Sequence, residues 1–162
     1  MNMFTYRQEY ISKLLSFKDK DLIKVVTGLR RSGKSTLLEL FREQLLNSGV
    51  GQDQVQFYNF ELPENYLDKT WDALYFEIKN KLETGKPNYI ILDEVQNIPL
   101  FEKLVDGLYA TANVDVYITG SNAFLLSSEL ATLLSGRYIE ISILPFSFKE
   151  YLTARGVDTG NK

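Results

Sequence analysis

Eight residues near the start of the chain constrain its fold more than any others. They fit the pattern G-x-x-x-x-G-K-[ST] without a substitution: Gly28-Leu29-Arg30-Arg31-Ser32-Gly33-Lys34-Ser35. In such a loop the glycines allow a tight turn whose backbone N–H groups point at phosphate oxygens, and a side chain on Gly33 would obstruct that approach. The pattern predicts that residues Gly28 to Thr36 bind a nucleoside triphosphate, with Lys34 at the β and γ phosphates and the Ser35 hydroxyl on Mg²⁺.

The surroundings of this loop support the prediction. Residues 22–26 form a short, β-branched run typical of a strand. After the glycines, leucines and Phe41 recur at helical spacing until Asn47-Ser48-Gly49 closes the segment. A helix that begins at the loop would add its unpaired N–H groups and the positive end of its dipole to the phosphate site. The alternative is an ordinary glycine turn between a strand and a helix.

Length and composition narrow the possible classes. At 162 residues, 44% of them hydrophobic, the chain is long enough for one α/β domain with a core. The net charge of −3 gives no electrostatic footprint for sequence-independent nucleic-acid binding, although a local basic patch stays open. The chain has no cysteine and no histidine, so acid–base chemistry must use carboxylates, lysine, tyrosine or water.

The two ends of the sequence carry expectations about location and domain bounds. No stretch approaches the roughly 20 apolar residues that span a bilayer, and charges lie within residues 1–9, where a signal peptide is hydrophobic. We therefore expect a cytoplasmic protein without a membrane partner. Residues 1–154 form the expected domain, with an apolar N-terminal helix. The polar residues 155–162 are either its edge or a cut through a longer protein.

Strand and helix patterns alternate along the rest of the chain. We expect strands at residues 55–60, 89–92, 114–119 and 138–143, and helices at residues 71–82, from Pro99 onward, and at residues 123–134. This order implies right-handed crossovers and a mostly parallel sheet covered on both faces. Ligands bind such sheets beyond the carboxyl ends of the strands, where the polar residues of this chain gather.

The pair Asp93-Glu94 follows the apolar strand at residues 89–92. An aspartate there is typical of a Mg²⁺ ligand, and the adjacent glutamate can polarise an attacking water. Neighbouring residues at a strand end point in different directions, so the two carboxylates can serve the two roles. The alternative is a pair of solvated acids that ends a strand. Gln96 is either a polar contact near the γ-phosphate or a cap or loop residue.

Three further polar residues are candidates for the site. Ser121 and Asn122 follow the strand at residues 114–119, where they either hydrogen-bond the attacking water or form an ordinary turn and helix cap. Arg137 precedes the last strand. It is either an arginine that stabilises transition-state charge on the γ-phosphate of a neighbouring subunit or a plain surface residue.

Four segments together resemble the AAA+ domain of a family of bacterial and archaeal ATPases. They are residues 28–36, residues 90–96 (Ile-Ile-Leu-Asp-Glu-Val-Gln), residues 118–122, and Leu134-Ser135-Gly136-Arg137 with the ending Pro-Phe-Ser-Phe-Lys-Glu-Tyr-Leu at residues 145–152. The resemblance implies an α/β fold, a P-loop NTPase three-layer α/β/α sandwich with five strands in the order 5-1-4-3-2. Members of this family are longer, and no helical lid follows the last strand of this sequence.

The same resemblance implies roles for individual residues. By this resemblance Lys34 and Ser35 belong to the Walker A motif, and Asp93 and Glu94 belong to the Walker B motif. Ser121 or Asn122 would be the sensor 1 residue, and Arg137 would occupy the arginine-finger position. It also implies a switch role for Asn59, which would hold Glu94 off its water.

The expected function is ATP binding and Mg²⁺-dependent ATP hydrolysis by an ATPase that is slow as an isolated chain. The catalytic residues would be Glu94, Lys34 and Arg137 with Ser121 and Asn122, and the metal ligands Ser35 and Asp93. Its partners would be ATP, a second copy of the chain when Arg137 acts in trans, and an unidentified protein. Two alternatives stay open: a nucleotide-dependent switch with little hydrolysis, and a phosphotransferase that acts on a small molecule.

Overall fold

The structure is a computed structural model that describes residues 7–120, 131, 132, 134–145, 152, 155 and 156. Its α-helices are α1 (Gln8–Phe17), α2 (Lys34–Asn47), α3 (Pro63–Tyr66), α4 (Trp71–Asn80) and α5 (Phe101–Tyr109). Its strands are β1 (Ile23–Gly28), β2 (Val55–Asn59), β3 (Asn88–Asp93), β4 (Val114–Thr119) and β5 (Tyr138–Ile143). Two 3₁₀ turns, η1 (Gln52–Gln54) and η2 (Val95–Asn97), complete the described elements.

The five strands form one sheet in the order β2-β3-β4-β1-β5, and every pairing between neighbours is parallel. Read from the other edge, this is the order 5-1-4-3-2, so the implied sheet order is confirmed. Because all strands run the same way, β1 and β3 end at the same edge of the sheet. The glycine loop and Asp93-Glu94 therefore meet at that edge, as the sequence predicts.

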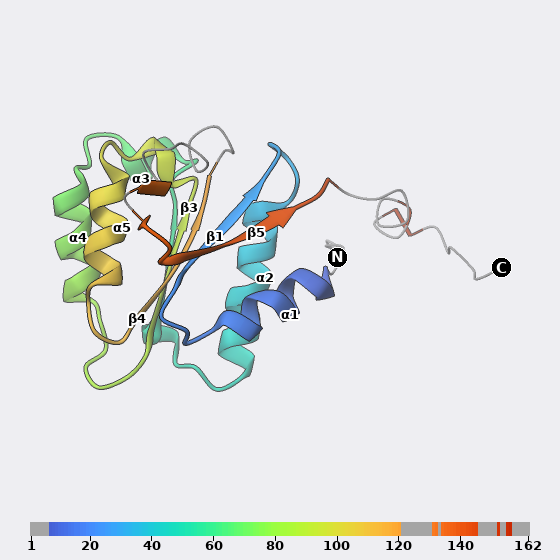
Figure 1. Cartoon of the computed structure of the whole chain (residues 1–162), viewed down its shortest axis with the longest axis horizontal. Coiled ribbons are helices and arrows are strands. Elements are labelled where there is room, and N and C mark those ends of the chain that lie inside the picture. Colours follow the sequence, from blue (N-terminus) through green and yellow to red (C-terminus); the bar gives the residue numbers. More distant parts are fainter. Residues whose placement is uncertain (1–6, 121–130, 133, 146–151, 153–154, 157–162) are drawn as a thin grey trace.

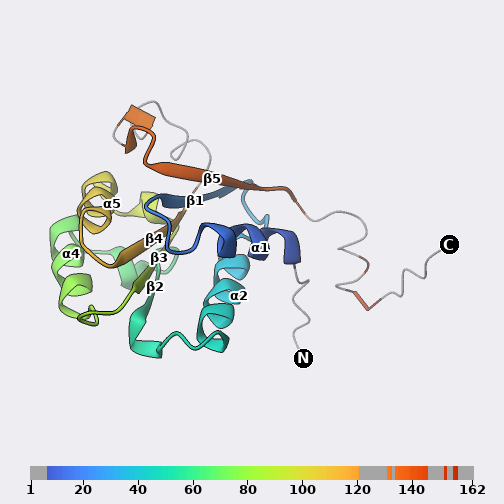
Figure 2. The ribbon, with the colours of Figure 1, turned by 60° about the horizontal axis from the view of Figure 1, so that its bottom comes forward.

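Helices cover both faces of the sheet, which makes a three-layer α/β/α sandwich. Figure 1 shows α4 and α5 on one side of the sheet and α1 and α2 on the other, and the turned view in Figure 2 agrees. Side chains alternate along the central strands: Ile90 and Leu92 pack with α4 and α5, while Tyr89 and Ile91 pack with α1 and α2. Both faces of β3 are therefore buried, which explains its unbroken apolar run.

The strands at residues 114–119 and 138–143 have the predicted bounds, whereas other elements differ at their ends. The helix expected at residues 71–82 ends at Asn80, and the one expected from Pro99 begins at Phe101. The single turn α3 is too short to show helical periodicity, so the sequence did not reveal it. Most of the helix expected at residues 123–134, and any lid after β5, lie outside the described residues.

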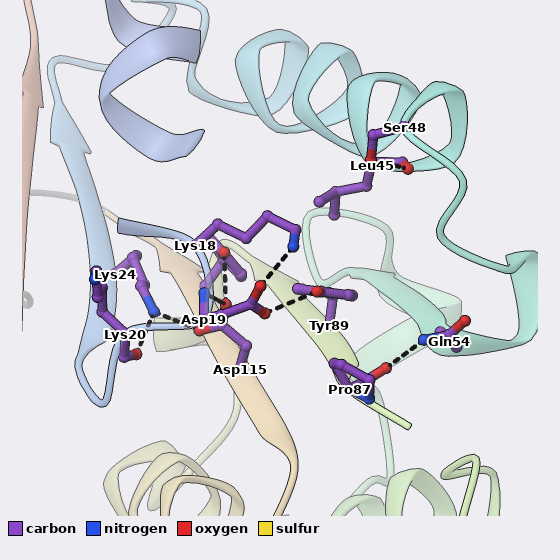
Figure 3. A network of polar contacts seen from close by, with 11 residues as sticks. Lys18, Asp19, Lys20, Lys24, Leu45, Ser48, Gln54, Pro87, Tyr89 and Asp115 are labelled. Atoms are coloured by element: carbon purple, nitrogen blue, oxygen red, sulfur yellow. Dashed lines mark hydrogen bonds and ion pairs between the residues drawn. The ribbon is translucent and has the colours of Figure 1, made fainter. Parts of the chain in front are cut away.

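A polar network ties the strands together at the edge opposite the glycine loop (Figure 3). Asp115 accepts hydrogen bonds from the buried ammonium of Lys24, from the Asp19 N–H at 3.0 Å and from the Tyr117 hydroxyl at 2.8 Å. The Tyr89 hydroxyl donates to Asp19 at 2.8 Å. Burial and the nearby Asp115 carboxylate raise the pKa of Tyr117, so its hydroxyl stays protonated and donates. This network stabilises the fold and contains none of the expected site residues.

No helix within the described part of the chain is both long enough and apolar enough to cross a membrane.

Candidate functional site

The glycine loop runs from β1 to the first turn of α2, as its pattern predicts. Two of its residues adopt left-handed backbone conformations, Arg31 with a φ of 65° and Gly33 with a φ of 92°. Gly28 is closely packed: a Cβ there would lie 2.6 Å from the Ser32 hydroxyl oxygen and 2.9 Å from the backbone oxygen of Ile143. The two glycines are thus required for different reasons: Gly33 supplies a left-handed turn, and Gly28 lets the loop pack against β5.

Lys34 begins α2 and is 5% exposed. Its ammonium donates to the backbone oxygens of Gly28 and Leu29, both at 3.1 Å. An ammonium has three N–H donors, so two hold the loop closed and the third is available to an acceptor. Lys34 therefore both stabilises the loop and carries a positive charge at its mouth.

A cavity of about 620 Å³ opens at the carboxyl edge of the sheet. One wall consists of the loop and the start of α2: Arg30, Arg31, Gly33, Lys34, Ser35 and Thr36. The rest of the lining consists of Glu61, Glu94, Gln96 and Asn97. The volume is within the range of small-molecule sites, and the lining carries positive charge from the loop and negative charge from Glu61 and Glu94. The structure thus brings most of the predicted loop residues and Glu94 to one cavity.

Asp93 ends β3 and is fully buried. The Thr119 hydroxyl, at the end of neighbouring β4, donates to its Oδ1 at 2.5 Å, whereas Oδ2 is buried without a hydrogen-bond partner among the described residues. Burial raises the pKa of the Asp93 carboxyl, although the nearby Ser35 and Thr119 hydroxyls act in the opposite direction. An unpartnered carboxylate oxygen close to a serine hydroxyl fits the hard oxygen ligands that Mg²⁺ prefers.

Glu94 turns away from β3 by a left-handed backbone conformation, with a φ of 56° and a ψ of 48°. Its N–H donates to the Thr119 hydroxyl at 2.9 Å, and its carboxylate accepts the Gln96 side-chain amide at 2.5 Å. The sequence predicted that strand alternation separates the two carboxylates. Instead the separation comes from this left-handed turn, which only the fold reveals.

The implied contact between Asn59 and Glu94 is replaced by another arrangement. The Asn59 side chain accepts the N–H of Glu61 at 2.9 Å, so it shapes the chain after β2. Gln96, which the sequence left open between a site contact and a loop residue, makes the contact with Glu94. Gln96 belongs to η2, and the Asn97 amide ties that turn to the Phe60 backbone oxygen at 2.8 Å.

Two residues of the site were missed by sequence reasoning. Thr119 links Asp93 to Glu94 through one hydroxyl, and Glu61 adds a third carboxylate to the cavity. Thr119 ends β4 and Glu61 lies two residues beyond the end of β2, and this position near a strand end was the signal available in the sequence.

Of the three further candidates, the structure describes only Arg137. Ser121 and Asn122 lie outside the described residues. Arg137 precedes β5, and its backbone oxygen accepts the Ile23 N–H at 2.8 Å, so it lies where β1 begins rather than where the loop starts. Its guanidinium is half-exposed, 3.4 Å from Asp106 and over the Tyr109 ring. Arg137 therefore lies at the opposite end of the strands from the cavity of its own chain.

Comparison with known proteins finds a matching family model and several similar sequences. A family model described as an AAA domain matches residues 20–152. An uncharacterized protein of Haemophilus influenzae is 45% identical over 159 residues, which cover 96% of this chain and 39% of that protein. Two uncharacterized proteins of Methanocaldococcus jannaschii are 35% and 32% identical and cover 80% and 90% of this chain. The chain spans 28% and 30% of their respective lengths.

A solved structure shares the fold. The crystal structure of Saccharomyces cerevisiae RIF2 superposes with a TM-score of 0.55 and 14% sequence identity, over 97% of this chain and 65% of that chain. At this identity the likeness concerns the fold alone.

Proposed function

The chain belongs to the AAA domain family, a family of nucleotide-binding P-loop domains, and on that premise we propose that it binds ATP and hydrolyses it with Mg²⁺. The observation that carries the proposal is the shared cavity, which is lined both by the glycine loop with Lys34 and by Glu94. A pure binding site needs the loop but does not need a catalytic carboxylate in the same cavity.

The loop and α2 would bind the triphosphate. Backbone N–H groups between Arg31 and Thr36 lie at the N-terminus of a 14-residue helix, where the dipole favours an anion. The Lys34 ammonium adds a full charge to this wall. Ser35 and Asp93 would hold Mg²⁺, which when bound neutralises charge that develops on the phosphate oxygens.

Glu94 would act on the attacking water. Its carboxylate takes a proton from water as the oxygen attacks the γ-phosphorus and the bond between that phosphorus and the bridging oxygen breaks. Two contacts fix the carboxylate for this task, the backbone bond to Thr119 and the side-chain bond from Gln96.

Measurements of Mg²⁺–ATP binding and phosphate release test the proposal, with the unmodified chain beside Lys34→Ala and Glu94→Gln. We expect Lys34→Ala to lose binding, and Glu94→Gln to bind ATP while phosphate release falls by about a hundredfold or more. Undiminished turnover in Glu94→Gln would refute the assigned base. Binding without turnover in the unmodified chain would leave a nucleotide-dependent switch as the function. Turnover that requires an added acceptor would indicate a phosphotransferase.

We propose in addition that Arg137 acts on the nucleotide of a second copy of the chain. Its place just before β5 is far from the cavity of its own chain, and about half of its side chain is exposed. A mixture of Lys34→Ala, which keeps Arg137, with Arg137→Ala, which keeps an intact loop, should recover turnover that neither variant has alone. No recovery at any protein concentration would refute action in trans.

A further inference from the structure

Arg7 is a buried arginine that contacts the glycine loop from a distant part of the sequence. It precedes α1, and only 6% of it is exposed. One guanidinium nitrogen donates to the backbone oxygen of Ser32 at 3.1 Å, and the other donates to the backbone oxygen of Leu144 at 2.7 Å. The guanidinium also lies over the Tyr10 ring, 4.6 Å from its centre. One side chain thus bridges the loop to the residue that follows β5.

The contact with Ser32 controls a group that faces the nucleotide cavity. The oxygen of Ser32 and the N–H of Gly33 belong to the same planar trans peptide, so they point in opposite directions. A donor that holds the oxygen on the Arg7 side directs the N–H to the other side. Gly33 lines the cavity, and backbone N–H groups of such loops are the donors that bind phosphate.

The loop needs this external contact because Gly33 leaves its own peptide weakly constrained. Glycine populates positive and negative φ about equally, and rotation at φ of Gly33 with ψ of Ser32 turns the peptide between them. Arg31, two residues before Gly33, also has a left-handed backbone conformation. The bond from Ser32 N–H to the Leu29 oxygen at 3.1 Å fixes the preceding peptide instead. Among the described residues, Arg7 is the side chain that donates to the Ser32 oxygen.

The second hydrogen bond of Arg7 anchors the loop to the residue that follows β5. Leu144 directly follows β5, which pairs with β1 along its whole length from Ile23 to Gly28. A planar guanidinium that spans both oxygens therefore holds the loop at a set distance from the sheet. A lysine ammonium is a point donor and lacks this fork geometry.

We propose that Arg7 is a positioning residue of the nucleotide site, which orients the Ser32–Gly33 peptide so that the Gly33 N–H meets a phosphate. This inference rests on the proposed nucleotide binding. It makes the N-terminal helix part of the site, because the residue that directly precedes α1 also sets the loop. By linkage, bound nucleotide must stabilise the docking of α1 as much as docked α1 strengthens nucleotide binding.

The test compares three variants of the full chain by titration calorimetry with Mg²⁺–ATP and with ADP, beside thermal unfolding of each. Arg7→Met keeps an apolar stem of similar length and removes both donors. Arg7→Lys keeps the charge but not the fork. Tyr10→Phe is the matched control, because it removes the bond from the Leu144 N–H to the Tyr10 hydroxyl, 3.2 Å long, and leaves the loop contact in place.

We expect Arg7→Met to raise both dissociation constants by about tenfold, Arg7→Lys by about threefold, and Tyr10→Phe by less than about twofold. A merely structural arginine would lower the unfolding temperature of Arg7→Met and leave the affinity of the folded protein unchanged, which would overturn the proposal. If Arg7→Met does not fold, unchanged affinity in Arg7→Lys overturns it equally. Failure of the unmodified chain to bind either nucleotide would instead refute the proposed function.

Discussion

Replacing Thr119 by valine tests whether its hydroxyl holds the two acidic residues of the site in place. Thr119 is fully buried, and valine has nearly the same shape, so the change removes two hydrogen bonds and leaves little cavity. The hydroxyl donates to Asp93 and accepts the Glu94 N–H. The other Asp93 carboxylate oxygen is buried and has no hydrogen-bond partner within the described residues, so it offers no replacement.

The magnitude follows from these two bonds. A bond to an ionised group contributes about 1.5–3 kcal/mol, and an N–H left without a partner costs about 1–3 kcal/mol. Asp93 escapes part of this cost by taking up a proton, since burial already raises its pKa. We therefore expect Thr119→Val to lower the free energy of unfolding by about 2–4 kcal/mol. Urea denaturation followed by circular dichroism would show a midpoint lower by about 1–2 M.

Thr27→Val is the matched control. Thr27 is also fully buried on a central strand, and its hydroxyl also donates to a carboxylate, that of Glu140 at 2.7 Å. Glu140 is exposed, so its carboxylate can turn to water when the hydroxyl is lost. We expect a loss of about 1 kcal/mol or less. If Thr119→Val loses no more stability than Thr27→Val, the reasoning about Asp93 and Glu94 is wrong.

Two further changes test the loop and the opposite edge of the sheet by the same urea measurement. Gly28→Ala places a Cβ against backbone that cannot move aside, so we expect a loss of about 1–3 kcal/mol and weaker nucleotide binding. Gly51→Ala meets only a flexible glutamine side chain and should change stability by less than about 0.5 kcal/mol; equal effects would contradict the argument. Asp115→Leu leaves the Lys24 ammonium buried without its carboxylate, which should cost about 3–5 kcal/mol. Adding Lys24→Met should recover most of this loss, and a double variant no more stable than Asp115→Leu would count against a buried ion pair.

The sequence predicts the elements well where burial imposes a period. The apolar run of β3 and the helical spacing of leucines in α2 each have one solution, a strand buried on both faces and a helix with one buried side. Periodicity does not fix which strands are neighbours. The sheet order came from the resemblance to a family, and the parallel pairing of β1 with β4 and β5 confirms it.

The site was predictable only in its local part. Lys34 and Asp93 stand in patterns whose chemistry depends on spacing along the chain, so the sequence is sufficient to propose them. The conformation of Glu94 is different. A left-handed glutamate is rare, and no residue beside it in the sequence signals the turn. The Thr119 hydroxyl that holds its N–H comes from another strand, 25 residues further along the chain.

Arg7 shows the same limit more sharply, because each of its two oxygen partners lies in a different segment. Ser32 is 25 residues away and Leu144 is 137 residues away. From the sequence alone, an arginine at the start of an amphipathic helix is expected to be exposed to solvent. It becomes buried only because α1 packs against both α2 and β5, where the sheet edge and the loop converge (Figure 2). Since the loop has little means of fixing its own Gly33 peptide, the packing of an apparently peripheral helix sets the geometry of the phosphate site.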